Sequence, residues 1–152
     1  MRSLVKLIHP VAGATALLMV SGFLIATLLA ELAGTPADIV VVKTAIPWLL
    51  LVLIPAIALA GGSGFRLGAG WTAPLAAAKR RRMPLIAANG LLVLVPAALF
   101  LAAKAEAGAF DATFYAVQAV ELLAGATNLV LLGLNARDGF VLSGRLRRRT
   151  AV

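Results

Sequence analysis

The sequence predicts an all-α membrane protein in which four transmembrane helices form an up-down-up-down bundle. Three observations carry this prediction: the composition, four long apolar segments and the distribution of basic residues. Hydrophobic residues make up 62% of the 152-residue chain and charged residues only 13%, and the mean hydropathy is +1.01. A soluble domain has roughly half apolar and about a quarter charged residues. The composition therefore favours a lipid environment, and we expect residues 1–152 to form one transmembrane domain.

Four segments reach the length of about 20 apolar residues that a membrane-spanning helix requires. They cover residues of about 4–30, 39–60, 83–103 and 114–134. The first starts like a secretory signal, but its apolar stretch is too long for one and the residues after Glu31 form a poor cleavage site. We therefore expect a retained helix. The glycines from Gly61 to Gly64 are expected to end the second helix in a flexible turn, and the short connections favour antiparallel neighbours.

Basic residues predict the orientation of the bundle. With four spans, one side receives the N-terminus, the connection 61–82 and the C-terminal tail. Twelve of the 14 basic residues fall on that side: Arg2, Lys6, Arg66, Lys79, Arg80, Arg81, Arg82, Arg137, Arg145, Arg147, Arg148 and Arg149. Only Lys43 and Lys104 fall on the other. Cytoplasmic loops carry the excess of Lys and Arg, so both termini are expected to be cytoplasmic.

Two features of the composition exclude other classes of protein and site. The chain has no cysteine, which excludes disulfides, thiolate metal sites and cysteine nucleophiles. The net charge of +8 would suggest nucleic acid in a soluble protein. Here it follows the membrane topology, because basic side chains pair with anionic headgroups. We therefore expect the lipid bilayer, and no nucleic acid, as a partner.

The first group of polar residues within the spans lies on the non-cytoplasmic half. Ionisable side chains at this depth are costly and normally face the bundle or a cavity. Lys43 lies about one turn into the second helix and Glu121 about two turns into the fourth, so an ion pair between them is feasible. Gln118 precedes Glu121 by three residues and shares its face. The sequence leaves three interpretations open: a structural pair, a Lys43 side chain that extends outward to the membrane surface, or a carboxylate that accepts a proton or cation or holds a quinone headgroup.

The asparagines within the spans form a second group, nearer the cytoplasm. Asn89 on the third helix and Asn128 on the fourth are expected to hydrogen-bond across helices, which contributes roughly 0.5–2 kcal/mol per bond. Asn135 follows Asn128 by seven residues and therefore lies on the same face. We expect this face to look into the bundle.

His9, the only histidine in the chain, is a candidate ligand for haem b. Neutral imidazole binds haem iron, and Gly13, four residues later, leaves room for a porphyrin on the same face. The pattern H-x-x-x-G resembles the haem helices of b-type cytochromes and of the membrane anchors of respiratory dehydrogenases. Those proteins carry several histidines, so a six-coordinate haem here requires His9 of a second copy or a methionine as the second ligand, whereas a haem transfer or sensing site could have His9 as its one axial histidine. The alternatives are a histidine that donates to a backbone carbonyl or an asparagine, and a proton relay.

Three functions follow as hypotheses. As a whole, the chain resembles small bacterial four-helix integral membrane proteins, and its richness in Ala, Leu and Arg is typical of a high-GC bacterium. The first hypothesis is a non-catalytic accessory or assembly protein of the bacterial inner membrane, acting by helix packing within a homodimer or larger complex. The second is a b-type haem or quinone-linked electron carrier with His9 as axial ligand. The third is a small proton-coupled transporter that uses Glu121. We find no hydrolase, kinase or dehydrogenase motif in the sequence.

Overall fold

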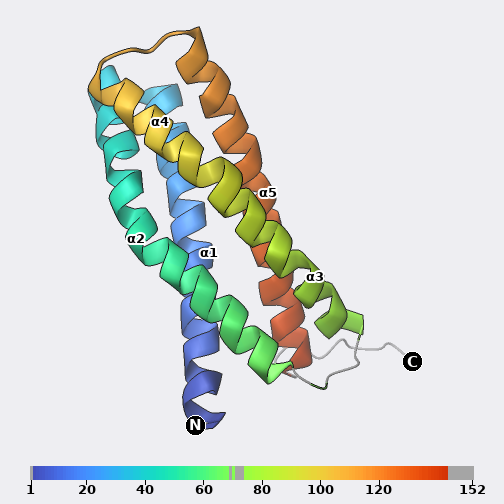
Figure 1. Cartoon of the computed structure of the whole chain (residues 1–152). Coiled ribbons are helices and arrows are strands. Elements are labelled where there is room, and N and C mark those ends of the chain that lie inside the picture. The colour runs from blue at the N-terminus through green and yellow to red at the C-terminus, as the bar shows by residue number, and fades with distance from the viewer. Residues whose placement is uncertain (1, 69, 71–73, 144–152) are drawn as a thin grey trace.

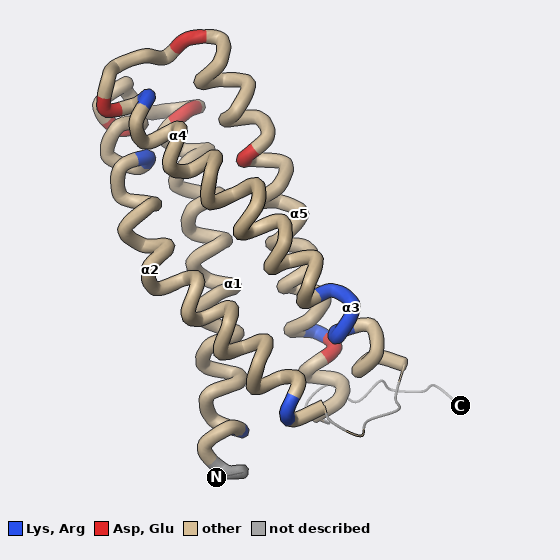
Figure 2. The backbone as a smooth tube through the Cα atoms, viewed as in Figure 1, with Lys and Arg blue, Asp and Glu red and all other residues tan. Residues whose placement is uncertain are grey.

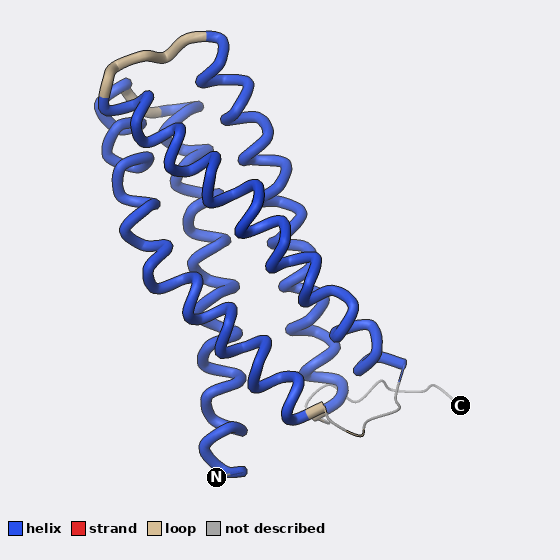
Figure 3. Tube along the Cα trace, in the orientation of Figure 1, coloured by secondary structure: helices blue, strands red, loops and turns tan. Residues whose placement is uncertain are grey.

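The protein is a bundle of long helices, seen here in a computed structural model (Figure 1). The structure describes residues 2–68, 70 and 74–143. Its elements are α1 (Arg2–Ala33), α2 (Pro36–Leu67), α3 (Pro74–Asn89), the π-helical segment η1 (Gly90–Leu94), α4 (Val95–Glu106) and α5 (Ala112–Leu142). Within these residues there is no β-strand (Figure 3). The prediction of an all-α protein is confirmed for the described part of the chain.

Four stretches of helix are long and apolar enough to cross a membrane. Among the described residues they are Leu4–Ala33, Pro36–Leu67, Pro74–Glu106 and Ala112–Leu142. The third comprises α3, η1 and α4, which run on as one rod (Figure 1). Each predicted segment lies inside one of these stretches. Large apolar side chains cover the outside of the bundle: Leu32, Leu92 and Trp48 are 75–83% exposed, as expected where lipid replaces water.

Successive helices run in alternate directions, and each contacts two neighbours. α1 packs against α2 and α5, and α4 packs against the same two helices. Among the described residues, the backbones of α1 and α4 do not approach each other closely, and neither do those of α2 and α5. The helices therefore occupy the corners of a square, with α1 opposite α4 and α2 opposite α5. Two buried apolar clusters lie between them, one around Ala16, Leu50 and Ile86 and one around Leu101 and Phe114.

The two ends of the bundle differ in charge (Figure 2). The start of α1, the end of α2, the start of α3 and the end of α5 form what we term the basic end. Its described basic residues are Lys6, Arg66, Lys79, Arg80, Arg81, Arg82 and Arg137. Arg145 and Arg147–Arg149 lie outside the described residues, as does the side chain of Arg2. The opposite end, termed the acidic end, has the acids Glu31, Asp38, Glu106 and Asp111 near or at its connections.

The connections at the acidic end are short and capped. Thr35 and Asp38 form a capping box at the start of α2, with Pro36 in its first turn, and this arrangement satisfies backbone N–H groups that lack a helical partner. The Asp111 side chain accepts from the Phe114 N–H at the start of α5. It also accepts from Lys104, 2.6 Å away. Chiefly through this bond to Lys104, with help from Thr113 and the Phe114 N–H, the pKa of Asp111 lies below its usual range.

The expectation that glycines end the second helix is wrong. α2 continues through Gly61, Gly62 and Gly64 to Leu67, and α3 begins at Pro74, not near Met83. The reason is packing. A Cβ atom on Gly61 would lie 3.1 Å from the Met83 side chain, and one on Gly64 would lie 3.0 Å from the His9 ring. Small residues allow such close approach within a helix bundle, so Gly61 and Gly64 are positions at which side chains of neighbouring helices pack against α2.

Candidate functional site

The Lys43 ammonium and the Glu121 carboxylate form an ion pair inside the bundle. Lys43 is 1% exposed and Glu121 is 12% exposed. Because α2 and α5 occupy opposite corners, this pair crosses the interior of the bundle. Removing both charges from water is costly, and their attraction offsets that cost only with good geometry and further hydrogen bonds. The polar side chains around the pair therefore determine how well the two buried charges are stabilised.

Three more polar side chains complete what we term the acidic-end cluster: Thr27, Glu31, Lys43, Gln118 and Glu121. The Lys43 Nζ lies 3.5 Å from the Thr27 hydroxyl oxygen. The Gln118 Nε2 donates to Glu121 over 3.3 Å. Glu31 on α1 lies close enough to Lys43 and Glu121 to interact electrostatically with both. α1, α2 and α5 thus each contribute to one cluster.

Two oxygens of the cluster have no hydrogen-bond partner among the described residues. They are Oε1 of Glu31 and Oε1 of Gln118, and both atoms are buried. The Gln118 residue is only 4% exposed. A buried acceptor without a partner costs about 1–3 kcal/mol, so such atoms mark an incomplete site. Next to the cluster lies a cavity of about 60 Å³, whose wall includes Thr27 and Glu121 among apolar residues of α1, α2 and α5.

The middle of the bundle holds a pair of asparagines. The Nδ2 of Asn89 donates to Asn128 Oδ1 over 2.9 Å and to the Ala124 carbonyl oxygen over 2.8 Å. The Nδ2 of Asn128 in turn lies 3.3 Å from the Ile86 carbonyl oxygen. Asn128 is 1% exposed. These bonds connect α3 with α5 just before the chain enters η1. Both amide nitrogens are used in bonds between the two helices, so the pair is a structural contact.

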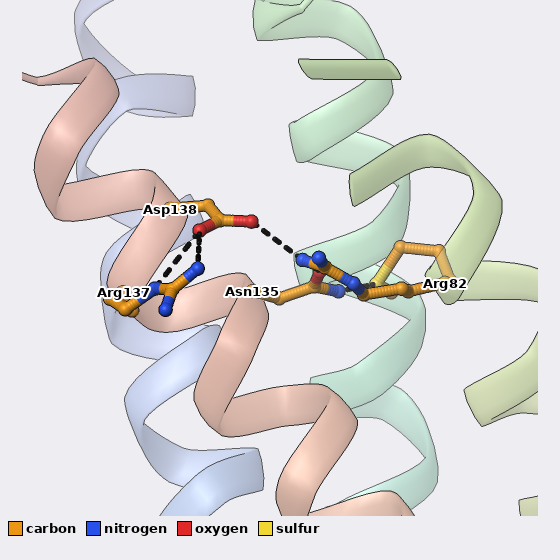
Figure 4. Close-up of polar contacts among 5 residues, drawn as sticks. Arg82, Asn135, Arg137 and Asp138 are labelled. Carbon is orange, nitrogen blue, oxygen red and sulfur yellow. Dashed lines mark hydrogen bonds and ion pairs between the residues drawn. The ribbon is translucent and has the colours of Figure 1, made fainter. Parts of the chain in front are cut away.

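A third polar group lies near the basic end (Figure 4). Arg82 on α3 donates to the Asp138 carboxylate over 2.6 Å, and Arg137 donates to the other oxygen of the same carboxylate over 3.1 Å. Arg82 also reaches Asn135 Oδ1, 3.4 Å away. The Asn135 amide faces the Met83 sulfur, likewise at 3.4 Å. Asp138 is 1% exposed, so its charge is held inside the bundle by two guanidinium groups.

The interior polar residues of α5 follow one helix face. Gln118, Glu121, Asn128, Asn135 and Asp138 are spaced by three or seven residues, which places them on one side of a helix. The prediction from the sequence included the first four of these. The prediction leaves out Asp138 because it lies four residues beyond the expected end of the apolar segment at residue 134, whereas Asn135 lies directly at that end. Its position, three residues after Asn135, was the signal that could have identified it.

His9 is half-buried and lies against α2. Its Nδ1 is 3.0 Å from the Ala60 carbonyl oxygen and 3.1 Å from the Ser63 hydroxyl oxygen. A carbonyl oxygen only accepts, so Nδ1 carries the hydrogen and Nε2 holds the lone pair of the neutral ring. Gly64 lies directly beneath the ring. His9 therefore has a bonding role between α1 and α2, and haem ligation by His9 stays a prediction.

Gly13, expected beside a haem, has open space around it. An added Cβ there would meet no other atom within 4 Å. The structure thus leaves the Gly13 surface uncovered within this chain. The acidic-end cluster lies at the other end of α1. Gly13 and that cluster are therefore separate places in the bundle.

Comparison with known proteins gives no relative from which a role could be transferred. No protein-family model, no curated protein and no solved structure matches the chain significantly. The function therefore has to be argued from the residues themselves.

Proposed function

We propose that the chain is a non-catalytic accessory or assembly subunit of a bacterial inner membrane, acting through helix packing in a homodimer or a larger complex. The observation that carries the proposal is a groove between α1 and α2. Its volume is about 320 Å³, and it is lined by Val5, Ile8, Ala58, Leu59, Gly62, Ser63 and Arg66. A Cβ atom added to Gly62 would meet no side chain or neighbouring helix of the described residues within 4 Å.

Gly62 differs in this respect from the glycines that contribute to packing within the bundle. Gly61, Gly64 and Gly125 each lie against a side chain of a neighbouring helix. A glycine on an open helix face allows the backbone of another membrane helix to come close, and van der Waals packing then drives association. The groove beside Gly62 supplies the apolar walls for such a helix.

Cysteine crosslinking tests this role, because the chain has no native cysteine. Gly62→Cys introduces one thiol into the groove, and Leu123→Cys introduces one on α5 at a position that is 72% exposed. In native membranes we expect Gly62→Cys to form a crosslinked species of higher mass, either with a second copy or with another membrane protein. Leu123→Cys is the matched control for random collisions in the bilayer. Equal crosslinking of the two variants contradicts the proposal.

We infer the orientation from the charge asymmetry. The basic end belongs on the cytoplasmic side by the positive-inside rule, which leaves the acidic end facing the other compartment. Single cysteines test this inference: Ser143→Cys lies after α5, and Ala107→Cys lies in the connection between α4 and α5. In intact cells with a permeable outer envelope, a membrane-impermeant thiol reagent should label Ala107→Cys and spare Ser143→Cys. The reverse labelling pattern contradicts the orientation.

A second candidate function, haem binding at His9, is favoured by one observation. Metal-bound histidines usually donate their other ring N–H to a carbonyl or carboxylate, and His9 donates from Nδ1 to the Ala60 carbonyl. Bound haem would supply one-electron redox chemistry. The chain has no other histidine, so a bis-histidine site requires two copies. Absorption spectra of the protein produced with added haem test the candidate: it requires a Soret band that His9→Ala abolishes.

A further inference from the structure

The charges of the acidic-end cluster do not cancel. Glu31 and Glu121 each bring one negative charge when ionised, whereas Lys43 brings one positive charge. Lys43 is paired with Glu121, which leaves the charge of Glu31 without an opposite partner of its own. In a region of low dielectric constant, an uncompensated charge is strongly disfavoured, and the group takes up a proton instead. The cluster therefore lacks one positive charge.

The hydrogen bonds of the cluster are also incomplete, and what they lack is a donor. The two atoms without a partner, Glu31 Oε1 and Gln118 Oε1, are both acceptors. An ionised carboxylate and an amide oxygen can only accept, so each of these atoms requires a donor that the described residues do not supply. What is missing is a hydrogen. A proton on Glu31 turns one of the two acceptors into a donor and neutralises the surplus charge in the same step.

Other ligands fit the cluster less well. A metal cation requires several oxygen ligands arranged around it, and here the Lys43 ammonium already occupies the space between Thr27 and Glu121. A second cation beside that ammonium would be repelled by it. A proton is bound covalently to one oxygen and needs no coordination shell. Among the described residues, no group of three or more His, Cys, Asp or Glu side chains could hold a metal ion.

We propose that Glu31 is a proton-binding site, which holds one exchangeable proton while Lys43 and Glu121 remain an ion pair. Protonation converts the Glu31 carboxylate and a proton from water into the neutral acid, and release returns that proton to water. Glu31 is half-buried and lies two residues before the end of α1 at Ala33, so the acidic end of the bundle provides the route to water. The proposal does not depend on the accessory role, and it places the proton on Glu31, not on Glu121.

The remaining charged groups near this end are accounted for. α2 contributes Asp38, which caps its own helix through Thr35. α4 contributes Lys104, which pairs with Asp111, and Glu106, which is exposed. The charges that act on Glu31 are those of Lys43 and Glu121. The number of protons that the cluster binds should therefore equal the number of its glutamates minus the number of its lysines, counted over Glu31, Lys43 and Glu121.

Infrared spectroscopy of the full-length protein in lipid nanodiscs tests this count. A protonated carboxylic acid has a carbonyl stretching band that a carboxylate lacks. At about pH 7, exposed Asp and Glu side chains are ionised, since their pKa values lie near 4. We expect the wild type to show the band of one acid, and raising the pH should remove that band. Glu31→Gln should lose it, whereas Glu106→Gln, the same substitution at an exposed position of the same end, should keep it.

Two further variants test the count itself. In Glu121→Gln, Lys43 has only Glu31 as a carboxylate partner, so Glu31 should ionise and the band should vanish. In Lys43→Met, both glutamates lack a counter-ion, so the band should double. Should Lys43→Met fail to fold, the comparison of Glu31→Gln with Glu106→Gln decides the question alone.

Three results overturn the proposal. One is a wild-type spectrum without an acid band at about pH 7. Another is a band that survives unchanged in Glu31→Gln. The third is a band that disappears at constant pH when sodium replaces choline, since that result means that a metal cation competes for the site.

Discussion

At the scale of single residues, the lone histidine shows how a polar side chain joins two helices. His9 donates to the backbone of α2 at Ala60, and its ring lies on Gly64. The interaction requires both a donor on α1 and the absence of a side chain on α2. A backbone carbonyl as the acceptor for His9 is one of three alternatives that the sequence leaves open. The sequence does not identify α2 as the partner, because its glycines are expected in a turn.

The contact between Gly64 and His9 gives the first prediction. A Cβ on Gly64 would lie 3.0 Å from His9 Cε1, closer than carbon atoms pack, and the hydrogen bond to Ala60 holds the ring in place. We expect Gly64→Ala to lower the thermal unfolding temperature in detergent. Gly62→Ala is the matched control, because nothing lies within 4 Å of an added Cβ there. In a His9→Ala background, Gly64→Ala should cause no further loss. An equal loss in both backgrounds contradicts the contact.

The second prediction concerns the two arginines that hold Asp138. Arg82 reaches the carboxylate from α3 and is 21% exposed, whereas Arg137 comes from the neighbouring position on α5 and is 63% exposed. Removing one partner of a buried pair leaves a charge without compensation. We expect Arg82→Gln to lower the free energy of unfolding by about 2 kcal/mol, since Arg137 compensates in part. Arg137→Gln should cost less. Denaturant titrations measure both values, and the opposite order contradicts the assignment.

How much of the site the sequence could predict depends on depth and helix order. Hydropathy gives the depth of each polar residue, and depth was enough to suggest the pairing of Lys43 with Glu121. It was also enough to predict that Asn89 and Asn128 hydrogen-bond across helices. In the sequence, Glu31 only marks the end of the first apolar segment, because the sequence does not reveal that α1 and α5 are neighbours. A residue at the edge of one span becomes part of a site only once the order of the helices is known.

At the scale of elements, hydropathy and helix length are different properties. The apolar segments were expected to cover about 4–30, 39–60, 83–103 and 114–134, and every helical stretch extends beyond these limits. Charged residues mark where the membrane ends, whereas helices continue as long as backbone groups find partners within them. The start of α3, with Lys79 and Arg82 in helical conformation, shows this. Arg82 reaches Asp138 from that extension.

The π-helical segment η1 is an element that the sequence analysis did not foresee. The Val95 N–H donates to the Gly90 carbonyl oxygen, five residues back, and Pro96 follows directly. Proline lacks an N–H and its ring collides with the carbonyl four residues before it, which here belongs to Leu92. A wider turn at this point accommodates that carbonyl. As an insertion of one residue, it also keeps α3 and α4 in the rotation that they would have in an ordinary helix one residue shorter.

The third prediction follows from this rotation. Deleting Leu92 removes the extra residue of η1, so an ordinary α-helix would keep α3 in the same rotation relative to α4. Inserting one alanine after Leu92, whose side chain is 76% exposed, instead adds a residue that η1 does not absorb and rotates α3 by about 100° relative to α4. Asn89 and Leu101 could then no longer face the interior at the same time. We expect the insertion variant to lose its folded, monodisperse form in gel filtration. Leu92→Ala changes the same position without the rotation and should behave as the wild type. An insertion variant as stable as Leu92→Ala contradicts a role for η1 in register.

At the scale of the whole molecule, the arrangement of helices around the bundle is what the sequence could not give. Four apolar segments with short connections predict alternating helices, but that pattern alone does not determine which two helices lie on opposite corners. In the structure, α2 and α5 lie on opposite corners, and Lys43 has to cross the interior to reach Glu121. The order of helices thus turns a pair of residues at similar depth into a buried ion pair.

The charge asymmetry of the bundle gives the last prediction, on lipid preference. The basic end has Lys6, Arg66, Lys79, Arg80–Arg82 and Arg137 within the described residues, where they meet the headgroup region if the bundle spans a membrane. A basic residue near an anionic surface contributes about 1 kcal/mol, and salt screens that attraction over about 10 Å at 0.1 M. We expect a higher unfolding temperature in nanodiscs of anionic phosphatidylglycerol than in phosphatidylcholine, with a difference that shrinks in high salt. The double variant Arg66→Gln and Arg81→Gln should reduce this difference. Lys104→Gln, at the acidic end, is the control for nanodiscs whose two leaflets have the same composition. It should leave the difference unchanged, because Lys104 is paired with Asp111. An unfolding temperature that is independent of lipid charge contradicts a headgroup role for the basic end.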